Sequence, residues 1–162
     1  MASGDTLAIF MPLGSEPPAS NYATLDTRNA HPVLDFDPAT AESILFSGVL
    51  PPNYAGGGLT VRLSWAATTA TGGDVVWSAA FERLSGQDID SDGFASARTA
   101  TGTANGTSGV LTVTSISFTH GAQIDSLAAG EAFRLQISRA AADAGDTMSG
   151  DAELIAVEIR EQ

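Results

Sequence analysis

The sequence lacks cysteine and lysine and contains no long hydrophobic run. Without cysteine, the chain can form neither a disulfide framework nor a thiolate metal cage. The apolar stretch from Leu7 to Leu13 is too short to span a bilayer. The segment before it carries Asp5 and no basic region of the kind that opens a signal peptide. These absences predict a soluble, unprocessed protein.

Positive charge is scarce and scattered. All seven basic residues are arginines, spread singly along the chain, against 19 acidic residues, which gives a formal net charge of -12. Binding to a phosphate backbone requires clustered Lys or Arg that release counterions. The same shortage disfavours attraction to anionic lipids. We therefore expect neither nucleic acid nor a membrane as a partner.

Histidine is scarce too. His31 and His120 are the only imidazoles, and neither has the spacing of a metal ligand or of a catalytic triad. His31 precedes a proline and His120 precedes a glycine, so both are expected in exposed turns. The sequence contains no G-x-S-x-G motif that would mark a hydrolase nucleophile. We predict no catalytic residues and no enzymatic activity.

What the chain does contain is apolar alternation with a period of two. The 162 residues are 43% apolar, enough for one domain with a single core. Alternation of this period is typical of strands with one buried face. It is clearest in two segments, Leu59–Ala66 and Val75–Glu82, and the glycine-rich turn at 72–74 predicts that they form a hairpin.

Further strands are expected toward the C-terminus, around Leu111–Phe118, Phe133–Ser138 and Ile155–Arg160. In the first of these the apolar phase changes between Val113 and Ile116, which indicates either a β-bulge near Thr114 and Ser115 or a strand buried on both faces. We predict the bulge. The segments that could form a helix are too short to be stable alone. Weaker strand candidates are Leu7–Met11, Val33–Phe36, Ile44–Val49 and Phe94–Thr101.

Regularly spaced strands with glycine-rich turns predict an all-β fold, an antiparallel two-sheet β-sandwich of jelly-roll or Greek-key type. Residues 41–162 would form this domain. Residues 1–40 are rich in proline and are predicted to form an extended N-terminal arm, which either wraps its own sandwich or reaches a neighbour. The aromatic residues expected between the sheets are Trp65, Trp77, Phe81, Phe118 and Phe133.

Asp88, Asp90, Asp92 and Gly93 form a D-x-D-x-D-G run, which resembles the first half of a calcium loop. The twelfth position of such a loop should hold a glutamate but is Thr99. The alternative is an acidic connector whose carboxylates cap turn amides. We expect the protein to bind no cofactor. If the run did bind calcium, Asp88, Asp90 and Asp92 would be the candidate ligands.

Four amphipathic aromatic residues have the ring chemistry to stack on a sugar. Both tryptophans lie in the apolar phase of their strands and are expected in the core. Tyr54 lies in a loop rich in proline and glycine, and it is the candidate carbohydrate-binding residue of this sequence.

Several segments together resemble small β-sandwich structural proteins of tailed bacteriophages. The resemblance is carried by YATLDTRNAHPVLDFD (22–37), FSGVLPPNYAGGGLTVRLSW (46–65), GGDVVWSAAFERL (72–84), DSLAAGEAFRLQISR (125–139) and ELIAVEIRE (153–161). It implies a non-enzymatic virion protein, most directly a head decoration or cement protein on the outer surface of the particle. Such a protein would be made in the host cytoplasm, bind the major capsid protein or other virion proteins, and form a homo-oligomer such as a trimer.

Two other functions are consistent with the sequence: a tail, neck or fibre component, and a carbohydrate-binding β-sandwich module. For the virion role we hypothesise that the N-terminal arm docks against a partner chain by strand addition. The predicted partner-binding residues are Thr6, Leu7, Ala8, Ile9, Phe10 and Met11.

Overall fold

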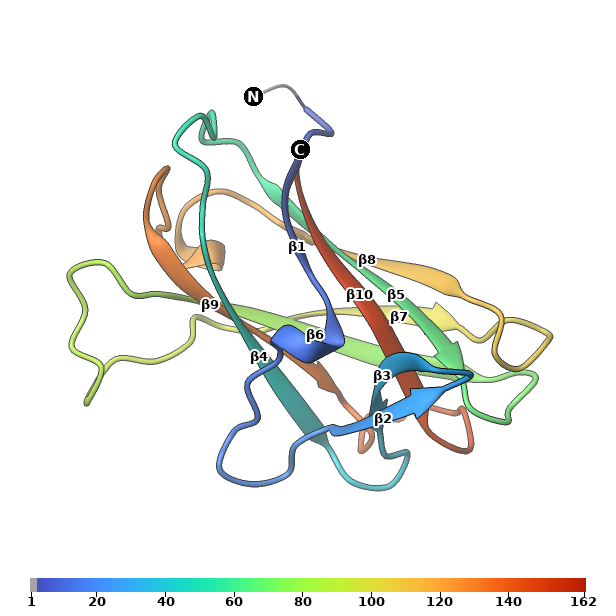
Figure 1. The fold of residues 1–162 in the computed structure, drawn as a ribbon. Coiled ribbons are helices and arrows are strands. Elements are labelled where there is room, and N and C mark those ends of the chain that lie inside the picture. The colour runs from blue at the N-terminus through green and yellow to red at the C-terminus, as the bar shows by residue number, and fades with distance from the viewer. Residues whose placement is uncertain (1–2) are drawn as a thin grey trace.

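The computed structural model describes residues 3–162, which fold into two packed antiparallel sheets (Figure 1). The strands are β1 (Thr6–Phe10), β2 (Thr24–Arg28), β3 (His31–Phe36), β4 (Glu42–Val49), β5 (Leu59–Ala67), β6 (Asp74–Arg83), β7 (Arg98–Thr103), β8 (Thr112–Phe118), β9 (Ala132–Arg139) and β10 (Ala152–Glu161). Two short 3-10 turns, η1 (Pro12–Gly14) and η2 (Ala122–Ile124), are the helical elements of this part of the chain.

The six-stranded sheet has the order β2-β3-β10-β5-β8, with β1 also paired to β10, and the four-stranded sheet has the order β4-β9-β6-β7. Neighbouring strands are antiparallel throughout. This confirms the predicted all-β sandwich. Within residues 3–162, no helix has the length and apolar character needed to cross a membrane.

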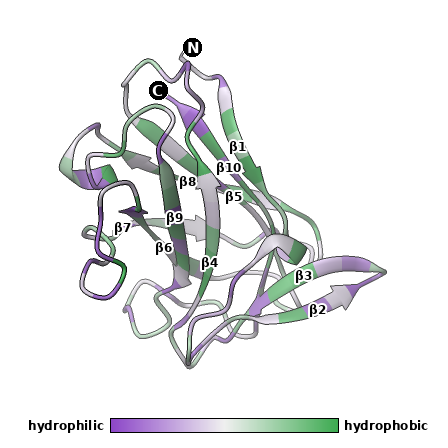
Figure 2. Cartoon of the chain, turned by 60° about the vertical axis from the view of Figure 1, so that its left-hand side comes forward, coloured by the Kyte–Doolittle hydropathy of each residue, from purple (hydrophilic) through white to green (hydrophobic). Residues whose placement is uncertain are grey.

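The core lies between the two sheets, where strand residues with a period of two point inward. Trp65 of β5 and Trp77 of β6 meet edge to face, with ring centroids 5.7 Å apart. Phe81 packs in the same way against Phe118 across the sheets, at 5.0 Å, and also contacts Phe133. The predicted aromatic core is therefore confirmed, and Figure 2 shows hydrophobic residues recurring along the strands that enclose it.

The predicted hairpin between the two clearest strands is wrong. β5 pairs with β10 and β8, whereas β6 pairs with β9 and β7, so the two strands belong to different sheets. Gly72 and Gly73 carry the chain from one sheet to the other. Alternation identifies the buried face of each strand, but both sheets of a sandwich bury one face against the same core.

The predicted bulge near Thr114 and Ser115 is also wrong. β8 pairs with β5 in unbroken register from Thr112 to Phe118. Thr114, Ile116 and Phe118 point inward, while Val113 lies on the outer face and is 48% exposed. The change of apolar phase therefore marks an apolar side chain on the surface.

The first forty residues do not form the predicted extended arm outside the sandwich. β1, β2 and β3 all belong to the six-stranded sheet, and the β2–β3 hairpin extends outward from it (Figure 2). Phe10 of β1 stacks on Phe46 at 5.3 Å and Leu7 is buried, so β1 contributes to the core. Burial of Leu7 and partial burial of Phe10 against the core explain why the N-terminal segment docks on its own molecule.

Candidate functional site

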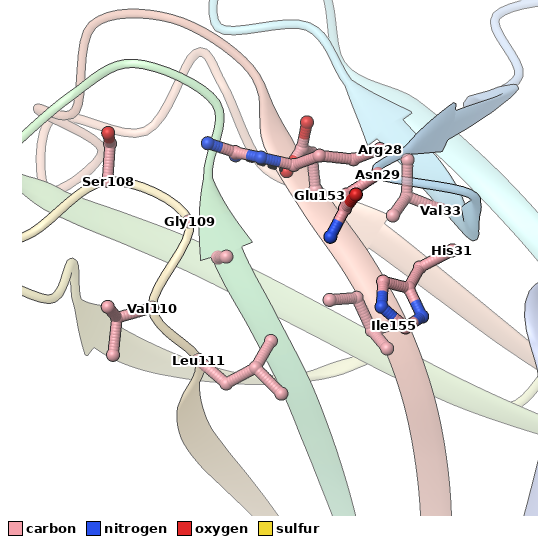
Figure 3. A pocket seen from close by; sticks show the side chains of 11 residues that line it. Arg28, Asn29, His31, Val33, Ser108, Gly109, Val110, Leu111, Glu153 and Ile155 are labelled. Carbon is pink, nitrogen blue, oxygen red and sulfur yellow. Dashed lines mark hydrogen bonds and ion pairs between the residues drawn. The ribbon is translucent and has the colours of Figure 1, made fainter.

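A pocket of about 520 Å³ lies on the outer face of the six-stranded sheet (Figure 3). One wall is the tip of the β2–β3 hairpin, and the opposite wall is the loop that leads into β8. Strands β10 and β5 form the floor between them. The volume is within the range of pockets that hold small ligands, roughly 300–1,000 Å³.

The floor and one wall of the pocket are apolar, and the rim is polar. Ala66 of β5 and Ile155 of β10 form the floor, Val33 of β3 lies on the hairpin side, and Val110 and Leu111 line the loop side. The polar lining residues are Arg28, Asn29, His31, Ser108 and Glu153. A pocket of this kind offers hydrogen bonds around its edge and van der Waals contact at its base, which suits a ligand with polar edges and an apolar face.

The hairpin wall is held by a tight two-residue turn. Arg28 and His31 are directly paired across β2 and β3, and Asn29 and Ala30 connect them with φ values of 47° and 63°. Positive φ at both central residues is the geometry of a type I′ turn, whose twist matches that of the flanking strands. The turn presents three polar residues of the rim, Arg28, Asn29 and His31, from a rigid support.

Arg28 joins the two walls of the pocket. Its Nη1 donates to Glu153 Oε2 at 2.7 Å and to the Ala67 carbonyl at 3.0 Å. The same carbonyl accepts a hydrogen bond from the Gly109 N–H, at 3.0 Å, in the opposite wall. A Cβ atom at Gly109 would lie 2.7 Å from Arg28 Nη2, so this glycine lets the guanidinium pass close to the loop backbone. Neither Nε nor Nη2 of Arg28 donates to another residue of 3–162, which leaves three N–H bonds for a ligand, one on Nε and two on Nη2.

Carboxylates surround the base of the hairpin. Asp35 is the cross-strand neighbour of Glu153, and its Oδ1 is buried without a hydrogen-bond partner among residues 3–162. Burial, followed by repulsion from Glu153 and Asp151, raises the pKa of Asp35 to about 6. Burial, followed by repulsion from Asp37, also raises the pKa of Asp151, and Glu153 adds to the repulsion. The neighbourhood of the pocket is therefore rich in negative charge.

Because the folded pKa of Asp35 is above its unfolded value, its ionisation destabilises the fold as pH rises through about 6. We expect Asp35→Asn to raise the free energy of unfolding by about 1–2 kcal/mol at pH 8 and to leave it nearly unchanged at pH 4. Partial solvent exposure keeps the gain below the full value of the shift. Urea denaturation across this pH range measures the difference, and Asp90→Asn, in an exposed loop, is the charge-matched control. A gain that is the same at both pH values would contradict the assignment.

The structure does not place Tyr54 on the surface. Its side chain is only 6% exposed and belongs to the core, and its hydroxyl donates to the Gly57 carbonyl and lies 3.2 Å from His120 Nδ1. The loop that carries the tyrosine is bound to the end of β10, because the Ala55 N–H donates to Glu161 Oε1 at 3.0 Å. Because its side chain is buried, Tyr54 has no ring face open to a sugar. Burial raises the pKa of its hydroxyl.

Asp88, Asp90 and Asp92 lie in the exposed β6–β7 loop, which extends away from the sandwich (Figure 1). Asp88 Oδ1 accepts a hydrogen bond from the Asp90 N–H, and Asp92 Oδ2 accepts one from the Asp88 N–H. These bonds are the turn-capping pattern of the alternative interpretation. No group of three or more His, Asp or Glu side chains in residues 3–162 is arranged to hold a metal ion.

The segment predicted to bind a partner pairs instead within its own molecule. Thr6 to Phe10 adds as β1 to the β10 strand of its own sheet rather than to a partner chain, and Met11 follows it at the start of η1. Of the two histidines, His120 contacts Tyr54, and His31 lines the pocket.

The pocket residues Arg28, Asn29 and Glu153 were not recognisable from sequence. Asn29 occupies a turn position, and an Asn followed by Ala is a weak hairpin signal. Glu153 lies 125 residues from Arg28 along the chain. A second, smaller hollow of about 230 Å³ is lined by Tyr22, Pro17, Leu25 and their neighbours, but it brings together few polar groups.

No protein-family model and no curated protein matches the sequence. Among solved structures, the chain is similar to the CBM22-1 xylan-binding domain from Paenibacillus barcinonensis Xyn10C, with a TM-score of 0.53 and 11% identity over 99% of this chain and 97% of that one. It is also similar to the carbohydrate-binding module CBM6cm-2 from Cellvibrio mixtus lichenase 5A in complex with cellotriose, with a TM-score of 0.51 and 12% identity over 98% and 99% of the two chains. A third match is Arthrobacter globiformis T6 isomalto-dextranase with panose, with a TM-score of 0.53 and 15% identity over 90% of this chain and 23% of that one. At these identities the matches establish a shared β-sandwich fold.

Proposed function

We propose that the protein is a non-catalytic carbohydrate-binding module whose glycan site is the pocket between the β2–β3 hairpin and the loop before β8. The observation that carries the proposal is the pocket itself, with an apolar floor and a polar rim. A sugar ring has the matching surface, because its hydroxyls lie at the edge and its C–H groups form an apolar face. The fold shared with two carbohydrate-binding modules over almost the whole chain supports the same function.

The floor of the proposed site is aliphatic, so a sugar bound there would not stack on an aromatic ring of the floor. His31 supplies the only ring among the lining residues. Hydrogen bonds from Arg28 and Asn29 are therefore expected to supply most of the binding energy. A hydrogen bond to a charged group contributes about 1.5–3 kcal/mol, which corresponds to a tenfold or larger effect on affinity.

We expect Arg28→Met to weaken glycan binding at least tenfold, because it removes the guanidinium donors and keeps the aliphatic stem. Affinity electrophoresis in gels that contain arabinoxylan, mixed-linked β-glucan or dextran measures the loss. Arg98→Met, in β7 of the other sheet, removes the same charge from an exposed arginine and should leave the retardation unchanged.

Arg28→Met also leaves Glu153 without its ion-pair partner, so a second variant separates binding from folding. Asn29→Gly removes the side-chain amide and suits the positive φ of that position. It should weaken binding with the unfolding transition intact. Unretarded migration of the wild-type protein in every gel, together with no signal on a broad glycan array, would overturn the proposed function.

The resemblance to phage decoration proteins predicts a different role. The virion location, the capsid partner and the trimer stay predictions. Mass spectrometry of purified particles tests them, since a decoration protein is present in many copies per particle.

A further inference from the structure

Next to the pocket lies an apolar shelf formed by Val110, Leu111 and Val113. Each of these side chains is 44–49% exposed. The first two line the pocket, and Val113 follows them on β8. Single exposed aliphatic residues are common, but three together beside a pocket mark a surface that a ligand can cover.

The shelf and the pocket floor lie on the same face of the sheet. Val113 is the cross-strand partner of Ser64, and Ala66 of the pocket floor is two residues further along β5. Residues two apart on a strand point to the same side and are about 7 Å apart. A ligand that fills the pocket and continues along the strands therefore reaches Val113.

The charges of the pocket favour a ligand without acidic groups. Arg28 is the only arginine that lines it, and its charge is paired with Glu153 at 2.7 Å. Asp35 and Asp151 add negative charge beside Glu153, as their raised pKa values reflect. A carboxylate of a uronic acid would enter a region of like charge, whereas a neutral hydroxyl can both donate to and accept from the rim.

Resting on the proposed function, we propose that the pocket and the apolar shelf together bind one neutral oligosaccharide, with one sugar held in the pocket and the following sugars lying over Leu111 and Val113. The ligand class is then a neutral glycan of several sugars, in preference to a monosaccharide or to an acidic glycan. The polar rim fixes the first sugar, and the shelf supplies contact area for the next.

Isothermal titration calorimetry with cello-, xylo- and isomalto-oligosaccharides of two and six sugars tests the extended site. The wild-type protein should bind the hexasaccharide of its preferred series at least tenfold more tightly than the disaccharide. Val113→Ser should weaken hexasaccharide binding about fivefold and leave disaccharide binding unchanged. Val49→Ser is the matched control, since Val49 is also an exposed strand valine, 58% exposed, but belongs to the other sheet.

Oligogalacturonate of six sugars tests the charge. It should bind the wild-type protein at least tenfold more weakly than the neutral hexasaccharide at low salt. Equal affinity for the disaccharide and hexasaccharide, or an equal loss for both in Val113→Ser, would overturn the shelf. Tighter binding of oligogalacturonate would overturn the preference for neutral sugars. These results differ from the absence of all glycan binding, which would overturn the proposed function instead.

Discussion

Replacement of Arg139 by methionine is expected to lower the free energy of unfolding by about 3–5 kcal/mol. Arg139 is fully buried on β9, and its guanidinium forms an ion pair with Asp146 at 2.7 Å, whose side chain is only 1% exposed. It also donates to the carbonyls of Phe36, Met148 and Gly150. The variant leaves a buried carboxylate and these carbonyls without their donor. Thermal denaturation should show a melting temperature lower by about 10 °C or more.

Two further variants show whether the loss comes from the unpaired charge. The double variant Arg139→Met with Asp146→Leu removes both charges and should be more stable than Arg139→Met alone. Arg160→Met, which removes an ion pair to Glu158 on the outer face, should cost no more than about 1 kcal/mol. If Arg139→Met were no more destabilising than Arg160→Met, the buried ion pair would not make the large contribution to stability that we expect.

Part of this arrangement is readable from the sequence. Arg139 continues the inward phase of Phe133, Leu135 and Ile137, so the alternation marks it as a core position. Its partner Asp146 lies in an irregular loop, where no periodicity indicates which side chain turns inward. The strand pattern therefore predicts the position of the buried charge but not its partner.

Alternation reports which face of a strand is buried but not which distant segment the strand contacts, and this explains which features of the fold are predicted correctly. Alternation identifies the clearest strands and the aromatic core, because the alternation of apolar and polar residues is a local pattern. It gave no signal for β2, whose residues are mostly exposed. It could not assign β5 and β6 to different sheets, since strand pairing depends on contacts distant in sequence. Proline content suggested an arm at residues 1–40, but the packing of Phe10 on Phe46 makes its first strand part of the sheet.

Sequence patterns could not predict the pocket, because its walls are distant from each other in the sequence. Its walls come from a hairpin near residue 29 and a loop near residue 109, which meet only when β10 and β5 lie between them. The outward phase of Leu111 and Val113 is a usable signal, although the change of phase it produces equally predicts a bulge. An apolar residue in the outward phase of an edge strand indicates a surface for contact as readily as a backbone irregularity.

The second large effect is expected at Gly73, where the chain passes from β5 to β6. Its φ is +95°, and a Cβ atom there would lie 2.7 Å from the Met148 Cα atom and 2.9 Å from its nitrogen. Gly73→Ala combines backbone strain with a clash against the backbone, and we expect a loss of about 2–4 kcal/mol in the free energy of unfolding. Gly72→Ala is the matched control, because no heavy atom lies within 4 Å of its Cβ position. It should change stability by less than about 1 kcal/mol. Urea denaturation of both variants measures the contrast.

Gly73 and Arg139 both lie against Met148, so the effects of replacing them should depend on each other. Met148 donates its N–H to the Asp74 carbonyl, next to Gly73, and its own carbonyl accepts a hydrogen bond from Arg139. A shift of Met148 caused by Gly73→Ala should already weaken the Arg139 contact. The double variant Gly73→Ala with Arg139→Met, measured at low temperature, should therefore be more stable than the sum of the single effects predicts, by about 0.5–3 kcal/mol. Strict additivity of the two losses would show that Met148 does not connect them.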